Sequence, residues 1–83
     1  MMKVIIDSGI SKSEMEEFFR EKGREIGNAS YEGRGWRVEM MQGKEFEYKS
    51  LPIPRTTVIF TGEVSAVDQL VSEYRKKFLK AGG

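Results

Sequence analysis

Apolar and polar positions at the start of the chain predict a strand followed by a helix. Val4 to Asp7 is a short β-branched run, and Ser8-Gly9 breaks it, so we expect a buried strand there. Ser11 and Glu14 then have the spacing of a helix capping box. The residues that follow at helical spacing are Met15, Phe18, Phe19, Lys22 and Ile26. The pattern predicts a helix that starts after Ser11 and ends near Gly27.

The centre of the chain alternates with the period of two that is typical of half-buried strands. Apolar residues fill every second position from 36 to 40 and from 46 to 48. A two-residue loop between these stretches would mix apolar and charged residues on one face. A three-residue loop over 41–43, with Gly43 in the left-handed region, sorts them. That register places Trp36 opposite Tyr48 and Arg37 opposite Glu47, and it is the one we predict.

The last third of the chain predicts a strand and a long helix. Pro52 and Pro54 end the preceding strand because proline has no N–H to donate, and Thr56 to Thr61 has high β propensity. Residues 65 to 81 carry an apolar stripe at helical spacing, formed by Val67, Leu70, Val71, Tyr74 and Phe78. The basic residues of the last turns complement the helix dipole, and they are Arg75, Lys76, Lys77 and Lys80.

These elements define the predicted fold class. It is an α+β two-layer sandwich of order β-α-β-β-β-α, with two helices packed on one face of a four-stranded, mostly antiparallel sheet. Both helices must cover the same face in order to bury their apolar stripes. In that arrangement Trp36 faces the helices, and we expect it to be largely buried near Tyr74 and Phe78.

Composition narrows the function classes. The 83 residues suit a single domain over 1–83, and a net charge of +1 gives no charge excess to attract a polyanion. The chain has no Cys and no His, which removes thiol catalysis, thiolate metal sites and the commonest general base. We expect no cofactor, no metal and no enzymatic activity. Without an apolar run long enough for a signal peptide or membrane span, a cytoplasmic protein is expected. Abundant Glu, Lys and Arg would suit a thermophile.

Two motifs could bind an anion or a nucleotide, but helix capping and turn formation also explain them. Ser11, Lys12 and Ser13 follow a predicted strand at a helix N-terminus, where free amides can hold an anion. The glycine spacing of a phosphate-binding loop is absent, so capping serines and a solvated lysine are favoured. Gly33-Arg34-Gly35 precedes a strand instead of a helix, which favours turn or bulge chemistry over a nucleotide site.

Basic residues of the central segment suggest a nucleic-acid surface. They are interleaved with aromatic residues, and the set is Arg34, Arg37, Lys44, Lys49 and Arg55. Four glutamates share the same stretch, at positions 32, 39, 45 and 47. The predicted register also turns the aromatic rings toward the helices and the charges to the other face. An RNA- or DNA-binding module is therefore the second hypothesis.

The face of the sheet opposite the helices carries the first hypothesis. The first and last strands are apolar at consecutive positions, so each places an aliphatic residue on the uncovered face. We expect Ile5, Ile59, Leu51 and Ile53 to form an interface there. The predicted function is a non-enzymatic protein-protein interaction module or a homodimer. The partner is another protein or a second copy, and no membrane is involved.

Overall fold

The computed structural model describes residues 1–42, 46–48, 51–53 and 55–78, and for 46–48 and 51–53 it describes the backbone alone. Seven strands and two helices follow along this part of the chain. Their bounds are β1 Met2–Ser8, α1 Lys12–Lys22, β2 Arg24–Gly27, β3 Ser30–Gly33, β4 Trp36–Gln42, β5 Phe46–Tyr48, β6 Leu51–Ile53, β7 Thr56–Gly62 and α2 Val64–Phe78.

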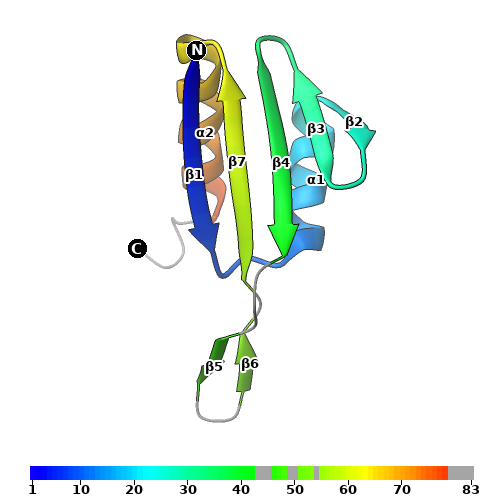
Figure 1. The fold of residues 1–83 in the computed structure, drawn as a ribbon, viewed down its shortest axis with the longest axis vertical. Helices are drawn as coiled ribbons and strands as arrows, with labels where there is room; N and C mark the ends of the chain where they lie inside the picture. Colours follow the sequence, from blue (N-terminus) through cyan, green and yellow to red (C-terminus); the bar gives the residue numbers. More distant parts are fainter. Residues whose placement is uncertain (43–45, 49–50, 54, 79–83) are drawn as a thin grey trace.

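Five of the strands form one antiparallel sheet in the order β1-β7-β4-β3-β2. Strands β2, β3 and β4 are consecutive neighbours, and α1 carries the chain from β1 at one edge to β2 at the other. Strand β7 returns between β1 and β4 and is paired along its full length with both. Strands β5 and β6 form a separate two-stranded sheet beyond the ends of β4 and β7 (Figure 1).

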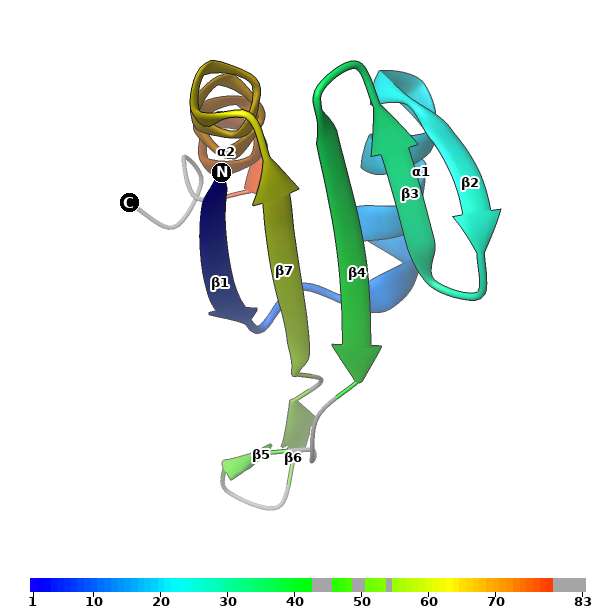
Figure 2. The same cartoon turned by 45° about the horizontal axis from the view of Figure 1, so that its top comes forward.

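Both helices lie behind the same face of the large sheet (Figure 1 and Figure 2). Phe19 of α1 and Tyr74 of α2 stack with ring centroids 6.4 Å apart, and both rings contact Phe60 of β7. Two-layer α+β packing with helices on one face is therefore confirmed. The sheet has five strands instead of the predicted four, because the segment between α1 and β4 folds into β2 and β3.

Helix α1 ends earlier than the spacing of apolar residues predicted. Its last residue is Lys22, and the amide of Gly23 donates to the carbonyl of Phe19 at 2.9 Å. Ile26 keeps the helical spacing but lies in β2, with its side chain half-buried. The Lys-Gly pair at 22–23 is a common C-terminal signal of helices, and it outweighs one more apolar residue in register.

The predicted central hairpin was wrong. Strand β4 has β3 on one side and β7 on the other, so Trp36 is paired with Gly33 and Gly62. Tyr48 is paired with Leu51 in the small sheet. Alternation sets which face a residue takes but not which strand lies beside it, and two better partners compete for β4. Gly43 lies outside the described residues.

The glycine-rich stretch Gly33-Arg34-Gly35 forms the turn that leads into β4. Gly33 and Trp36 are cross-strand partners, which leaves Arg34 and Gly35 as a two-residue loop. Gly35 has φ of +80°, a conformation that a Cβ disfavours. The turn prediction for this motif is thus confirmed, and the hairpin that it closes is β3-β4.

Trp36 faces the helices, as predicted, but it is only half-buried. Its ring lies 6.3 Å from that of Phe19, on α1 instead of the predicted Tyr74 and Phe78 of α2. A Cβ on Gly33 would overlap the indole, approaching its Nε1 to 2.5 Å, and one on Gly23 would come within 2.8 Å of Cη2. Two glycines therefore make the room that this ring occupies.

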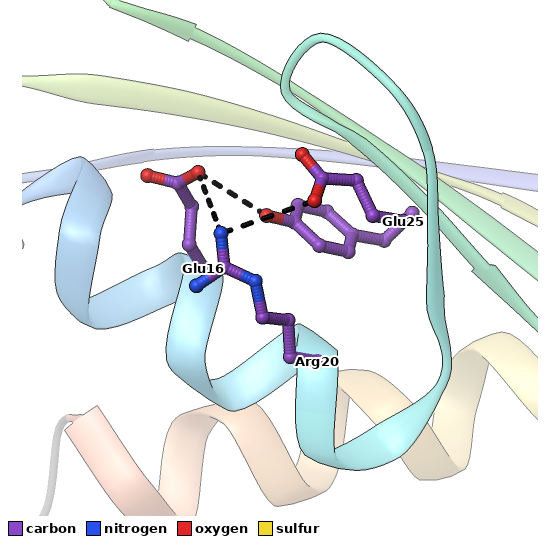
Figure 3. Close-up of polar contacts among 4 residues, drawn as sticks. Glu16, Arg20 and Glu25 are labelled. Atoms are coloured by element: carbon purple, nitrogen blue, oxygen red, sulfur yellow. Dashed lines mark hydrogen bonds and ion pairs between the residues drawn. The ribbon is translucent and has the colours of Figure 1, made fainter.

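A polar network joins α1 to β2 and β3 at the side of the core. The Arg20 guanidinium lies 3.6 Å from the Glu16 carboxylate and 3.9 Å from that of Glu25 (Figure 3). The buried Tyr31 donates its hydroxyl to Glu16 Oε2 at 3.2 Å. Burial, followed by the negative charge of Glu16 and this hydrogen bond, raises the pKa of Tyr31.

Candidate functional site: the open face of the sheet

The candidate site is the face of the five-stranded sheet that the helices leave uncovered. Side chains alternate along each strand, so the buried residues of β7 and β4 and the half-buried residues of β1 identify the helix-facing positions. The intervening positions form the open face. They are Lys3, Ile5 and Asp7 on β1, Thr57, Ile59 and Thr61 on β7, and Arg37, Glu39 and Met41 on β4.

An apolar row crosses two of these strands. Ile5 and Ile59 are direct cross-strand partners, and Ile59 is next to Glu39 of β4. Ile5 is 60% exposed, and Ile59 is half-buried between its neighbours. Met41, 56% exposed, is one step along β4, opposite Thr57. Ile5 and Ile59 together form the apolar row, and Met41 lies beside it.

The other half of the open face is charged. Arg37 lies beside Glu32 of β3 and Thr61 of β7 instead of the predicted Glu47. Glu32 accepts two hydrogen bonds from the Arg24 guanidinium, at 2.7 and 3.2 Å. The open face therefore has isoleucines at the centres of β1 and β7 and ion pairs at β3 and β2, with β4 at the boundary.

Leu51 and Ile53, the other two predicted interface residues, are not in the large sheet. They belong to β6, where their cross-strand partners are Tyr48 and Phe46. Their side chains lie outside the described residues. Sequence reasoning missed Met41 because it assigned this residue to a loop. Extending the alternation 37, 39 by one more position would have found it.

The basic residues predicted to meet nucleic acid do not share one surface where they are described. Arg37 is exposed on the open face, whereas Arg34 lies in the β3-β4 turn. Arg34 also lines a hollow of about 270 Å³ on the helix side, with Trp36 and Leu70 among its other walls. Arg55 donates to Asp7 Oδ2 at 2.8 Å. Lys44 and Lys49 lie outside the described residues.

The predicted anion site is at the N-terminus of α1. Ser11 is the N-cap, but its side chain makes no capping hydrogen bond to a backbone amide. Its hydroxyl donates to Glu14 Oε2 at 2.9 Å and lies 3.4 Å from the Ser13 hydroxyl. The Glu14 carboxylate thus supplies the negative charge that the helix end favours. Lys12 is the first residue of the helix and is half-buried.

The described part of the chain offers little other chemistry. It contains no group of three or more Asp or Glu residues arranged to hold a metal ion. None of its helices is long and apolar enough to cross a membrane. Tyr74 Oη is buried without a hydrogen-bond partner among the described residues. Burial raises the pKa of Tyr74, while the side chain of Ser8, which approaches the phenol without forming a hydrogen bond of normal geometry, and the positive charge of Arg75 lower it.

The fold and this face define a small α+β protein with one covered and one partly apolar, uncovered sheet face. The family model for the archaeal MoaD-like protein matches residues 3–83, so the chain belongs to that family. Its match extends over almost the whole chain, from β1 through α2. No curated protein matches the sequence.

Proposed function

We propose that this member of the archaeal MoaD-like family is a non-enzymatic interaction module that binds another protein chain through the open face of its sheet. The observation that carries the proposal is the Ile5–Ile59 pair on the uncovered face. Two adjacent aliphatic side chains with Met41 beside them form an apolar surface that a partner can remove from water.

The surroundings of the apolar row support a protein partner. Arg37 and Glu39 lie on one side of it, and Lys3 and Asp7 precede and follow Ile5 on β1. Charges of both signs around an apolar centre are typical of the polar rim of a protein interface. A polyanion would meet carboxylates as well as amines on this face. Of the described arginines, Arg34 and Arg37 lie on different sides of the sheet, so they do not form one basic surface. Nucleic-acid binding is therefore the alternative function.

The proposal is tested by identifying the protein that contacts position 59. A photo-crosslinking amino acid replaces Ile59 in one variant and Asp68, an exposed residue of α2, in a control. We expect position 59 to crosslink a protein that position 68 does not. That protein is then purified and its affinity measured with the wild type, Ile59→Lys and Ile59→Val.

The affinities decide the result. Ile59→Lys should raise Kd at least about tenfold because it places a charge at the apolar centre, while Ile59→Val should bind nearly as well as the wild type. Equal binding by all three proteins would remove the open face as the site. Labelled RNA and DNA serve as the alternative arm. Affinity that falls steeply with salt and is lost in Arg37→Ala would favour nucleic acid instead.

A further inference from the structure

Strand β1 is a long and regular edge of the large sheet. Among the described strands only β7 pairs with it. Its seven residues are in continuous register with β7, without a bulge or proline. The opposite edge, β2, has four residues and a register shift between Glu25 and Gly27. Long regular edges are templates for pairing with another strand, and short irregular ones are not.

The sequence of β1 is self-complementary about its centre. If a second copy of β1 runs antiparallel to the first with Ile5 opposite Ile5, the residues that face each other have numbers that sum to 10. Lys3 of one copy is then opposite Asp7 of the other, twice, on the open face. Val4 is opposite Ile6, twice, on the helix-facing side, where both side chains are half-buried and retain exposed apolar surface.

The neighbouring registers lack this match. Moving the centre of the pair by one residue shifts each residue's partner by two positions, so every side chain stays on its own face of the sheet. Centring the pair on Val4 puts Lys3 opposite Ile5, and centring it on Ile6 puts Ile5 opposite Asp7. Both place a charge against an isoleucine. Over residues 3–7, a single register therefore places opposite charges together and apolar residues together, which favours a two-fold symmetric contact.

We propose that two copies of this chain pair through the outer edge of β1, antiparallel and centred on Ile5, to form a symmetric homodimer with one continuous sheet. Backbone hydrogen bonds between the two β1 strands hold the dimer, and the Lys3–Asp7 pairs select its register. Asp7 accepts from Arg55 through Oδ2 within its own chain, so the acid is already held in place at this edge.

This dimer deepens the proposed function. It rests on that function only for the role of the joined open face in binding a partner. Ile59, Ile5 and the same two residues of the second copy would form one line across the centre of the continuous sheet. Glu39 would stand at each end of that line. The apolar row of one chain is thereby doubled, which provides a larger surface for a protein partner.

The experiment uses two full-length variants with opposite charge changes, Lys3→Asp and Asp7→Lys. In either variant alone the dimer would bring like charges together at both pairs. In a mixture of the two, each pair would again join an acid to a base. Mass is measured by sedimentation over a concentration series for the wild type, each variant and the mixture, and circular dichroism confirms that each variant is folded.

We expect a wild-type dimer whose dissociation constant rises at least about tenfold in each single variant, and a mixture that recovers the wild-type value as a heterodimer. A wild type that stays monomeric at millimolar concentration would overturn the inference. So would a dimer that both charge variants leave intact. If Ile59→Lys abolishes self-association and the charge variants do not, two copies meet through the open faces and the edge is not used.

The readouts of the two proposals are separable. Loss of partner binding in Ile59→Lys with an intact dimer tests the open face alone. Loss of the dimer in each charge variant, with recovery in their mixture, tests the edge alone, because Ile59 is unchanged in all of these samples.

Discussion

The two faces of the same strands behave differently. On the covered face, Val58 and Phe60 of β7 are fully buried under helices, and the residues beside them on β4 and β1 are apolar. On the open face, Ile59 of the same strand has Ile5 on one side and Glu39 on the other. The covered face holds the domain together, whereas the open face leaves apolar surface exposed in the folded chain. That exposed surface is the basis of the proposed function.

The largest expected effect distinguishes the two faces at adjacent residues of β7. Phe60→Ala should lower the free energy of unfolding by about 3 to 5 kcal/mol, because it leaves a cavity between Phe19 and Tyr74. Ile59→Ala should cost about 1 kcal/mol, since it removes a half-buried side chain of a strand. Chemical denaturation of both variants measures the difference. Equal costs would mean that the open face is part of the core.

A smaller effect tests how the Trp36 ring is accommodated on the covered face. Gly33→Ala should destabilise the protein by about 1 to 3 kcal/mol, because its Cβ would overlap the indole. Gly27→Ala is the matched control, since a Cβ there meets nothing within 4 Å, and it should change stability by less than about 0.5 kcal/mol. Tryptophan emission should move to longer wavelength in the first variant only. Unchanged emission in both would place the ring elsewhere.

Two buried tyrosines, Tyr31 and Tyr74, allow the contribution of a hydrogen-bonded hydroxyl to be compared with that of an unpartnered one among the described residues. Tyr31→Phe should cost about 1.5 kcal/mol because the hydroxyl that it removes donates to the Glu16 carboxylate. Tyr74→Phe should be neutral or slightly stabilising, since the hydroxyl of Tyr74 is buried without a hydrogen-bond partner among the described residues. Thermal melting of the two variants at neutral pH provides the measurement. A costly Tyr74→Phe would reveal an interaction of that hydroxyl.

The smallest effect concerns alkaline pH. The pKa of both Tyr31 and Tyr74 is raised above the ordinary value of 10.0, first of all by burial. The folded protein therefore holds these protons more tightly than the unfolded chain does. This stabilisation is complete below pH 10 and is lost as the pH rises through the folded-state pKa values. Absorbance titration should show both phenols ionising later than in the unfolded protein, and Tyr31→Phe should remove one of the two late steps.

Much of the architecture was predictable from local patterns. Alternation and β-branched residues identified β1 and β7, and the stripe from Val67 to Phe78 identified α2. Placing Ile5 and Ile59 on the uncovered face followed from the same alternation. Strands β2 and β3 were missed because they are four residues each, and Ile26 continued the helical spacing of α1. The C-terminal signal at Gly23 was the only local evidence against that extension.

Strand neighbours were the part that sequence reasoning could not supply. The alternation in β4 fits Phe46–Tyr48 as well as it fits β3 or β7, because a period of two specifies a face and carries no information about the partner. The choice depends on which pairing lets both helices bury Phe19, Tyr74 and Trp36 on one side. That condition involves residues distant in sequence, and the prediction that Leu51 and Ile53 join Ile5 failed for the same reason.

The sequence by itself determined which residues are apolar, which face of each strand they occupy, and that Lys3 and Asp7 stand symmetrically about Ile5. Those are properties of spacing along one segment. Only the tertiary structure decided that β1 is an edge, that Ile59 is the neighbour of Ile5, and that Arg34 and Arg37 are on different sides of the sheet. Strand order arises from long-range packing of the helices on the sheet, and no local pattern encodes it.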